Sequence, residues 1–448
     1  MLAANRHNLV VGLGKSGLAA ARHLLARGER VTACDSRAEP PGLAALRREF
    51  PGLATRLGGF DPALFAGADR VVVSPGLDRR RLPLAAGVPV VGEIELFAQA
   101  VARPVVAITG TNGKSTVTTL VGALAARCGR RVLLGGNLGM PALELLRETP
   151  APEFYVLELS SYQLETTASL RPLVATVLNV SPHHVDRYAD LDEYLATKAR
   201  VFAGDGVMVL NRDDPRVLGL RRAQRRTLTF GLDAPADDAF GLVQHGGAAW
   251  LARGTRRLLP ASALCLAGRH NLANALAGLA IAAALELPEA PCLEALQQFR
   301  GLPHRLEWLG ESGGVRWFND SKATSVGAAC AALDGLDGPL LLIAGGQPEP
   351  VDYAPLGRAA QGKVRAALLV GDEVDVLQRA LAGSVPVERA ASLDAAVARA
   401  AALAAPGDSV LLSPACASFD RYRDFEQRGD RFRDAVRRQL GLATGARA

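Results

Sequence analysis

The chain has 448 residues, too many for one ordinary core, and this length predicts about two to four domains, with three as our expectation. Hydrophobic residues at 49% and charged residues at 21% are typical of a globular protein and exclude a disordered or fibrous one. The net charge of +6 is small for this length, and the run RRAQRR at 221–226 is expected to be a solvated surface rather than a nucleic-acid site.

The N-terminus, MLAANRHNLVVGLG, lacks the charged start, long apolar run and small-residue cleavage site of a signal peptide. No stretch approaches the roughly 18 apolar residues that a membrane span needs. Six widely spaced cysteines without a CxxC pair indicate reduced thiols and no structural zinc. We therefore expect a cytoplasmic protein with no membrane partner and no nucleic-acid partner.

Short β-branched runs alternate with Ala/Leu-rich stretches along the chain, as in NLVVGLG, GLAAARHLLARG and RVTACD. This rhythm predicts an α/β fold with parallel sheets flanked by helices. It recurs in PVVAITG with KSTVTTLVGALAARCG, and in GPLLLIAGG, VRAALLVG and DSVLLSPA. We predict three domains, 1–96, 97–301 and 302–448, because a helix meets a proline in ELFAQAVARPVV and Gly301 and Pro303 interrupt a later helix.

The first motif is a glycine turn. Gly12, Gly14 and Gly17 spell G-x-G-x-x-G after the first strand, and Asp35 ends the next strand. Such glycines admit a phosphate to the helix N-terminus, and the acid can reach a ribose hydroxyl, so the pattern favours a dinucleotide site. An NAD-dependent dehydrogenase is one hypothesis, and a tight turn without a ligand is the alternative.

The second motif, AITGTNGKSTVTTL at 107–120, runs from an apolar strand through a glycine loop into a helix that begins at or just after Lys114. Backbone N–H groups of 110–113 can cradle phosphate oxygens, the lysine can face the outer phosphates, and Ser115 or Thr116 can ligate Mg²⁺. The loop is shorter than G-x-x-x-x-G-K-[ST]. Because all its parts occur together, we predict a phosphate site rather than a structural turn.

Hard oxygen ligands for magnesium are expected nearby. Glu158 stands near the end of a buried strand in YVLELSSYQLE, although it could instead pair with an arginine. The loop NVSPHHVDRY presents His183, His184 and Asp186, a weak signal by itself because such histidines are often surface groups.

Two asparagines, Asn271 and Asn274, lie one helical turn apart beside His270 in GRHNLANALAGLA. They are either satisfied core amides or nucleotide contacts, and the residues alone leave both interpretations open.

The last third of the chain carries a further polar group: Arg305, Asp320, Lys322 and Thr324. Asp320 could simply cap a helix, whereas a lysine close to an ATP phosphate could neutralise charge during phosphoryl transfer. The stretch LLSPACASFDRYRDFEQRGDRF, 411–432, leads from a strand through small polar residues into a charged helix. It could bind a small anionic substrate.

Together these segments resemble one family. ITGTNGKST, LELSSYQLE, NVSPHHVDRY, YLATKARVF, GRHNLANALA, GLPHR, NDSKAT and LLSPACASFD occur in order over essentially the whole chain and are similar to motifs of the Mur ligases of peptidoglycan synthesis. The resemblance implies an N-terminal Rossmann-like domain for a UDP group, a central P-loop ATPase-type domain with a parallel sheet, and a C-terminal Rossmann-like domain. It changes the ligand expected at the first glycine turn from NAD to a uridine nucleotide.

The resemblance also implies an activity that uses ATP and Mg²⁺. The carboxylate of UDP-N-acetylmuramoyl-L-alanine attacks the γ-phosphate to give an acyl phosphate, and the amino group of glutamate then displaces phosphate through a tetrahedral intermediate. The protein's task is charge neutralisation and positioning. We expect a monomer with these small molecules as its only partners. A ligase that adds glutamate to folate shares a similar ATP loop, but SPACASFD and the N-terminal glycine turn favour the Mur branch.

The resemblance implies roles for individual residues. The substrate nucleotide is assigned to Gly14, Lys15, Ser16, Asp35, Ser36, Arg37 and Asn137. ATP is assigned to Gly110, Thr111, Asn112, Gly113, Lys114, Ser115, Thr116, Asn274, Arg305 and Asp320. The metal is assigned to Ser115, Thr116, Glu158, His184 and Lys198. Glutamate is assigned to Lys322, Thr324, Ser418 and Phe425. Catalytic roles fall to Lys114, His184, Lys198 and Lys322.

Lys198, in YLATKARVF, is one of only five lysines beside 46 arginines. An ammonium group next to Glu158 and His184 would oppose magnesium. In the relatives this lysine is carbamylated by CO₂, which an uncharged amine permits and a guanidinium does not. The resemblance suggests the same here, and the alternative is a lysine packed on a helix surface.

The sequence departs from the family pattern at two places. An acidic residue usually precedes the metal histidine, whereas this chain has His183, so the metal ligand is either His183 or His184. The turn after LLLIAGG usually reads D-G-K, whereas GGQPEPVDY puts Gln347 and Glu349 at those positions. Because a glutamate would repel a glutamate substrate, either Lys322 or an arginine takes the carboxylate, or the turn points elsewhere, or the amino-acid specificity is altered, for example to L-glutamate.

Overall fold

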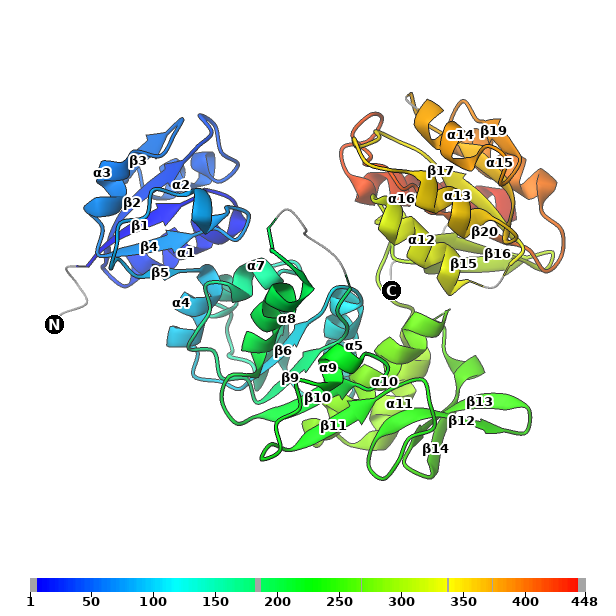
Figure 1. The fold of residues 1–448 in the computed structure, drawn as a ribbon, viewed down its shortest axis with the longest axis horizontal. Helices are drawn as coiled ribbons and strands as arrows, with labels where there is room; N and C mark the ends of the chain where they lie inside the picture. Colours follow the sequence, from blue (N-terminus) through cyan, green and yellow to red (C-terminus); the bar gives the residue numbers. More distant parts are fainter. Residues whose placement is uncertain (1–5, 182–186, 267, 337, 373, 442–448) are drawn as a thin grey trace. The chain divides into compact units, whose positions relative to one another are not determined.

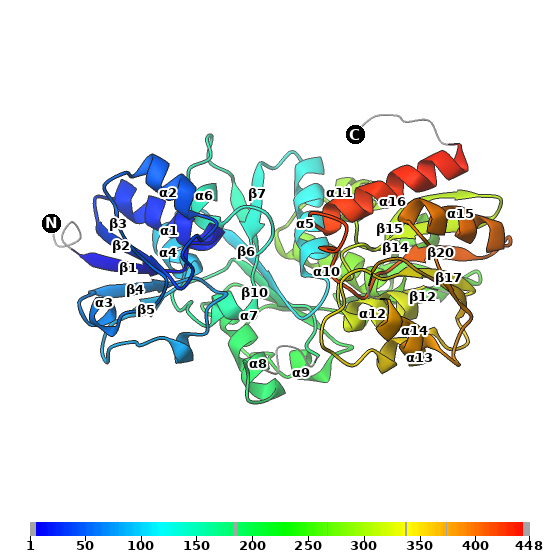
Figure 2. The same cartoon turned by 90° about the horizontal axis from the view of Figure 1, so that it is seen from above.

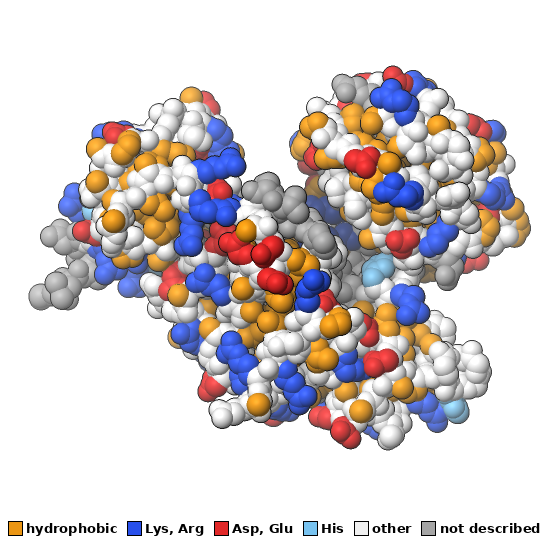
Figure 3. All heavy atoms as spheres, viewed as in Figure 1, with side chains coloured by type: hydrophobic (Ala, Val, Ile, Leu, Met, Phe, Trp, Pro, Cys, Tyr) orange, Lys and Arg blue, Asp and Glu red, His pale blue; other side chains and the backbone are white. Residues whose placement is uncertain are grey.

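The computed structural model describes residues 6–181, 187–266, 268–336, 338–372 and 374–441 (Figure 1). The chain divides into two compact units, Met1–Pro260 with Ala273–Leu296, and Ala261–Leu272 with Gln297–Ala448. Within each unit, helices cover sheets that are mainly parallel (Figures 1 and 2). Basic and acidic side chains are interspersed over the face of the molecule seen in Figure 3. Among the described residues, no helix combines the length and apolar character needed to cross a bilayer.

The first sheet has the order β3-β2-β1-β4-β5, with parallel neighbours throughout. Alternate residues of its strands serve two cores, because Val10 packs with α1 on one face while Leu9 and Val11 pack with Phe65 on the other. The strands are β1 (His7–Val11), β2 (Arg30–Asp35), β3 (Ala54–Leu57), β4 (Arg70–Val73) and β5 (Val90–Val91). The helices are α1 (Lys15–Ala26), α2 (Leu43–Glu49), α3 (Pro62–Ala66), η1 (Arg79–Arg81) and α4 (Glu93–Ala100).

The second sheet has the order β14-β13-β12-β11-β10-β9-β6-β8-β7. It is parallel from β7 to β12 and continues as the antiparallel meander β12-β13-β14. Every residue of β6 and β8 is buried, as expected for inner strands covered on both faces. The strands are β6 (Val105–Thr109), β7 (Val132–Gly136), β8 (Phe154–Glu158), β9 (Val174–Val177), β10 (Val207–Asn211), β11 (Thr227–Phe230), β12 (Phe240–His245), β13 (Ala248–Arg253) and β14 (Arg256–Pro260).

Helices of the same region follow the parallel strands and connect them. They are α5 (Lys114–Arg127), α6 (Ala142–Leu145), α7 (Ser161–Leu164), α8 (Leu191–Ala199), η2 (Arg200–Phe202), α9 (Pro215–Leu218), η3 (Ala261–Ala263), α10 (Arg269–Ala284) and α11 (Glu289–Gln298). The helix α5 begins at Lys114, as the glycine loop before it predicts.

The third sheet has the order β15-β16-β20-β17-β18-β19, antiparallel only between β15 and β16. Leu340 and Leu342 of β17 pack with α12, α13 and α14, whereas Leu341 and Ile343 pack with α15 and α16 on the opposite face. The strands are β15 (Glu307–Ser312), β16 (Val315–Asn319), β17 (Leu340–Ala344), β18 (Val364–Leu369), β19 (Val387–Arg389) and β20 (Ser409–Leu412). The helices are α12 (Val326–Gly335), α13 (Ala354–Ala360), α14 (Asp375–Leu381), α15 (Leu393–Leu403) and α16 (Phe425–Leu440).

The fold class predicted from the sequence is confirmed: three α/β sheets follow one another along the chain. In each sheet the strand order reverses around an inner strand, β1, β6 or β20. Open α/β sheets bind ligands at the carboxyl ends of the strands near such a reversal. The loops after these strands are therefore the expected positions of a ligand-binding site.

Candidate active site

The loop between β6 and α5 has the geometry of a phosphate site. Gly113 precedes α5 with φ of +81°, a left-handed conformation that glycine favours. A Cβ at this position would lie 2.4 Å from Oδ1 of Asn274, so α10 closes against the loop. The Nζ atom of Lys114 donates to the carbonyl oxygens of Gly110 at 3.0 Å and Thr111 at 2.8 Å. Since N–H groups at a helix start attract anions, the loop suits a triphosphate.

A residue outside the predicted set fixes this loop. Asn179, which follows β9, accepts from the N–H of Asn112 through Oδ1 at 2.8 Å and donates from Nδ2 to the Asn112 carbonyl at 3.1 Å. Its own carbonyl accepts from the N–H of Thr111 at 3.0 Å. Its place after a buried strand in NVSPHH was the available signal. Ser115, at the start of α5, is 5% exposed, and Asn274 is 8% exposed.

Lys198 lies inside the protein, not on a helix surface. It is 1% exposed, its Nζ donates to the carbonyl of Gly110 at 2.9 Å, and the same atom lies 4.4 Å from the ring centre of Tyr194. Lys114 donates to that same Gly110 carbonyl, so two lysines converge on one acceptor. Burial, and secondarily the charge of Lys114, lowers the pKa of Lys198 to about 6. The amine is therefore largely uncharged at neutral pH.

Glu158 stands at the end of β8 and is 2% exposed. Its Oε1 accepts from Nδ2 of Asn137 at 2.6 Å, which brings the predicted substrate residue and the predicted metal residue together. Its Oε2 is buried and has no hydrogen-bond partner among the described residues. A buried carboxylate oxygen without a partner is costly unless a cation binds it. The alternative of an arginine partner finds no support among these contacts.

The histidine assignment stays a prediction, because His183, His184 and Asp186 lie outside the described residues. In the part of the chain that the structure describes, no three His, Cys, Asp or Glu side chains are grouped to hold a metal ion. The fit of a cation here therefore rests on Glu158 Oε2 and on hydroxyl oxygens such as that of Ser115, which are donors that Mg²⁺ prefers.

The first glycine turn borders a cavity of about 310 Å³. Its lining holds all six nucleotide candidates of the N-terminal region, together with the segment after β4: Gly12, Gly14, Lys15, Ser16, Asp35, Ser36, Arg37, Ser74, Pro75, Gly76 and Leu77. Asp35 is 2% exposed and accepts from the N–H of Leu13 at 2.7 Å and from Nη2 of Arg37 at 2.8 Å. The Arg37 hydrogen bond lowers the pKa of Asp35 to about 2. The carboxylate thus holds a half-exposed guanidinium at the cavity.

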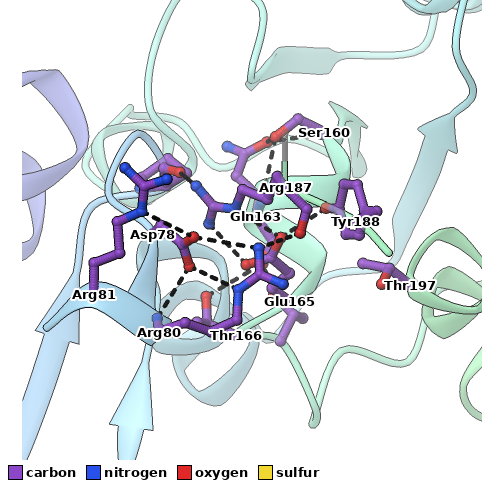
Figure 4. A network of polar contacts seen from close by, with 12 residues as sticks. Asp78, Arg80, Arg81, Ser160, Gln163, Glu165, Thr166, Arg187, Tyr188 and Thr197 are labelled. Atoms are coloured by element: carbon purple, nitrogen blue, oxygen red, sulfur yellow. Dashed lines mark hydrogen bonds and ion pairs between the residues drawn. The ribbon is translucent and has the colours of Figure 1, made fainter. Parts of the chain in front are cut away.

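A buried ion pair between Arg187 and Glu165, the C-cap residue of α7, lies in the polar network of Figure 4 and reaches Pro75, which lines that cavity. Arg187 donates to both carboxylate oxygens of Glu165, at 3.0 and 2.7 Å, and from Nη1 to the carbonyl of Pro75 at 3.2 Å. Tyr188 donates to Glu165 at 2.7 Å. The Arg187 and Glu165 side chains are 7% and 13% exposed. Sequence reasoning missed this pair, although Arg187 lies in the quoted stretch NVSPHHVDRY.

In the C-terminal unit, Lys322 Nζ lies 3.7 Å from the ring centre of Phe425, so two predicted glutamate residues are in contact. Asp320 is 9% exposed and accepts from the N–H of Leu306 at 3.1 Å and from Oγ of Ser413 at 3.2 Å. Burial raises its pKa to about 7. Asp320 does not cap α12, whose cap is Ser325.

Four other predicted residues differ in their exposure to solvent. Ser418 is 2% exposed, Thr324 and Thr116 are half-buried, and Arg305 is exposed.

The turn that departs from the D-G-K pattern lies beside Ser418. Gln347 and Ala417 exchange backbone hydrogen bonds of 2.9 and 3.0 Å. The N–H of Glu349 donates to the hydroxyl of Tyr353 at 3.0 Å, and the side chains of Gln347 and Glu349 are exposed. The turn is thus attached to the segment that carries Ser418, and the direction of its side chains relative to the glutamate site stays a prediction.

Comparison with known proteins gives three matches in chain order. The chain matches the Mur ligase MurD-like N-terminal domain over 6–92, the Mur ligase middle domain over 108–282, and the Mur ligase glutamate ligase domain over 304–416. It is 54% identical to "UDP-N-acetylmuramoylalanine--D-glutamate ligase" of Nitrosococcus oceani, with 97% of both chains covered. It is 47% identical to the protein of the same name from Pseudomonas putida, with 97% and 98% covered.

Two solved structures share the fold at low identity. The MurC ligase of Thermotoga maritima has a TM-score of 0.59 at 18% identity over 97% of this chain and 99% of that one. A pseudomurein peptide ligase of Methanothermus fervidus has a TM-score of 0.59 at 19% identity over 97% and 100%.

The fold and the phosphate loop define a nucleotide-dependent enzyme of the amide-forming ligase class. The chain belongs to the Mur ligase family, as the identity of its relatives over nearly their whole length shows. Its predicted family is thus confirmed, and the dehydrogenase alternative is set aside.

Proposed function

We propose that the chain is the ATP-dependent ligase that adds D-glutamate to UDP-N-acetylmuramoyl-L-alanine during synthesis of the peptidoglycan precursor. The observation that carries this proposal is the relatives' shared name at 45–54% identity over nearly the full chain. The glycine loop before α5, the cavity of about 310 Å³ at the first glycine turn and Glu158 at the end of β8 support the proposal.

Activation of the substrate carboxylate takes place at the loop before α5. The N–H groups that start α5 and the ammonium of Lys114 bind the β and γ phosphates, with Asn274 against the loop. Attack by the carboxylate on the γ-phosphorus breaks the bond to ADP and gives an acyl phosphate. Because a free carboxylate is a poor electrophile, this step supplies the leaving group. The protein contributes charge neutralisation and alignment.

Magnesium would be held by Ser115, Thr116, Glu158, His184 and a carbamylated Lys198. When bound, the ion would neutralise charge on the transferring phosphoryl group. The uncharged amine of Lys198 suits carbamylation: its nitrogen attacks CO₂ and loses a proton, which turns a buried base into an oxygen donor. The unpartnered Oε2 of Glu158 supports a cation at this place.

The second step uses the C-terminal unit. Lys322, Thr324, Ser418 and Phe425 bind the incoming glutamate, whose amino group attacks the acyl carbon and expels phosphate through a tetrahedral intermediate. The contact of Lys322 with Phe425 supports a common site. Asp320 and Arg305, which follow residue 301 in the chain, contribute to ATP binding.

Phosphate release tests the proposal. Purified protein with ATP, Mg²⁺ and UDP-N-acetylmuramoyl-L-alanine is expected to release phosphate on addition of D-glutamate. The same assay with L-glutamate is the matched control. Activity with L-glutamate alone would contradict the D-glutamate assignment and leave the family intact. That arm matters because Glu349 stands in the turn beside Ser418.

Lys198 has its own test. Lys198→Arg is expected to abolish ligation, and added bicarbonate should not restore it, because a guanidinium does not form a carbamate. Lys198→Ala should regain part of its activity with short carboxylic acids, which can occupy the space of the carbamate. Wild-type activity of Lys198→Arg would refute the carbamate.

We also propose domain limits of 1–96, 97–301 and 302–448, with the nucleotide cavity in the first, the ATP loop in the second and the glutamate residues in the third. The protein works as a monomer in the cytoplasm. Limited proteolysis tests the limits, and light scattering on the purified protein tests the monomer.

A further inference from the structure

Arg428, on α16 in the C-terminal unit, has a role that the predicted site leaves unassigned. Its side chain is buried, at 3% exposure, and its guanidinium donates six hydrogen bonds to three separate segments. The acceptors are Ser321 Oγ at 3.0 Å and Ser321 O at 2.9 Å, Gly345 O at 3.3 Å, Cys416 O at 3.2 Å from each of two nitrogens, and Ala417 O at 3.2 Å.

These acceptors lie in the loops that follow the carboxyl ends of β16, β17 and β20, where α/β sheets bind ligands. Each loop continues directly into the proposed glutamate site. Ser321 precedes Lys322, Ala417 precedes Ser418, and Gly345 precedes the turn that holds Glu349.

The start of α16 is tied to the same cluster. Ser321 donates from Oγ to the carbonyl of Phe425 at 2.8 Å. A Cβ on Gly346 would lie 2.2 Å from the Ala417 carbonyl oxygen and 3.0 Å from Nη1 of Arg428, so the turn packs directly on the guanidinium. One planar group therefore sets the spacing of three loops and of the helix that carries Phe425.

The guanidinium has no ion-pair partner among the described residues, and the Asp420 carboxylate, which lines the same small cavity, is the acid whose charge favours its protonated form. Among the described ion pairs, none includes Arg428, and each of its hydrogen bonds ends on a carbonyl or a hydroxyl oxygen. Burial lowers its pKa to about 10, so the guanidinium stays protonated at neutral pH. The buried cation, with Asp420 near it, lies beneath the loops, where the chain lacks the lysine of the D-G-K pattern. Because five donors in a rigid plane reach all three loops, a lysine does not replace it.

We propose that Arg428 is a positioning residue of the glutamate site: it fixes the loops that carry Lys322, Thr324 and Ser418, and its charge favours an anionic amino acid there. This inference rests on the proposed function. It explains how the site tolerates Glu349 without a second cation in the turn.

Steady-state kinetics of Arg428→Lys and Arg428→Gln test the proposal. Both variants are expected to raise KM for glutamate about tenfold or more, because the loops would no longer hold Lys322, Thr324 and Ser418 at the spacing that binds glutamate. KM for ATP and for the UDP-linked substrate should stay within about twofold. A merely structural role predicts instead that all three KM values rise together, or that kcat alone falls.

Arg433→Gln is the matched control. Arg433 lies on the same helix, but its guanidinium pairs with Glu307 and Asp430 and reaches none of the three loops. This variant should keep the wild-type KM for glutamate. In Arg428→Ala, millimolar guanidinium ion should lower KM for glutamate again, whereas methylammonium should not.

Two outcomes overturn the inference: a folded Arg428 variant with the wild-type KM for glutamate, or equal rises in all three KM values. If the Arg428 variants do not fold, Ser321→Ala decides. It removes the Oγ hydrogen bonds to the guanidinium and to the Phe425 carbonyl and should raise KM for glutamate severalfold, while an unchanged value refutes the role. A wild-type protein that does not use glutamate refutes the proposed function instead, so the two failures are distinguishable.

Discussion

Replacing Lys198 by methionine is expected to stabilise the protein while abolishing ligation. The lysine is 1% exposed and has a pKa of about 6, whereas an unfolded lysine titrates near 10.5. Between these pH values the unfolded chain binds one proton more than the folded chain. The free energy of unfolding therefore rises with pH across this window, by about 1.4 kcal/mol per pH unit, and the cost of the buried amine is greatest at and below pH 6.

The magnitude follows from the same two pKa values. At pH 7.5 the amine costs roughly three pH units' worth of free energy, about 4 kcal/mol. Methionine is unbranched and fills similar space, but it gives up the Nζ hydrogen bond to Gly110, which contributes about 1 kcal/mol. The variant should thus be more stable than the wild type by about 3 kcal/mol at pH 7.5. The gain should shrink to about 1 kcal/mol at pH 9.

The assay is urea unfolding of both proteins between pH 6.5 and 9 in CO₂-free buffer. Bicarbonate forms a separate arm: it should raise the melting temperature of the wild type, since a group that binds only the folded state stabilises it, and leave the variant unchanged. A variant less stable than the wild type at pH 7.5, or a difference in stability that is independent of pH, would show that burial of the amine does not destabilise the folded protein.

Three further predictions concern other residues. Gly113→Ala should raise KM for ATP at least tenfold in initial-rate assays, because φ is +81° and the new Cβ would meet Asn274 Oδ1 at 2.4 Å; an unchanged KM would exclude the loop from ATP binding. Arg187→Gln should lower the free energy of unfolding by about 3 kcal/mol, because it leaves the buried carboxylate of Glu165 without its cation. The double variant Arg187→Gln with Glu165→Gln should recover most of that loss in urea unfolding. A double variant as unstable as Arg187→Gln alone would contradict the argument. Glu349→Lys should lower KM for glutamate severalfold. Measuring KM for D-glutamate and for L-glutamate shows whether the turn distinguishes the two isomers. An unchanged KM for both would place the turn outside the site.

Local sequence determined the elements that begin and end within a few residues of their signals. The glycine loop before Lys114 predicts a helix start there, and the structure begins α5 at that residue. Likewise Glu158 was expected near the end of a buried strand, and it is the last residue of β8. Such features depend on backbone conformations and hydrophobic runs that a short window contains, so they can be read without knowing the fold.

The tertiary structure alone decided which distant residues meet. The burial of Lys198 depends on its meeting Gly110, 88 residues earlier. Arg428 reaches Ser321 across 107 residues of chain and Gly345 across 83. Strand order brings these loops to one edge of a sheet, and strand order is set by packing of whole layers rather than by local pattern. The sequence by itself therefore determined the family, the secondary-structure elements and the chemistry of individual side chains. The desolvation of Lys198, the unpartnered oxygen of Glu158 and the hydrogen bonds of Arg428 to three loops followed only from the packed fold.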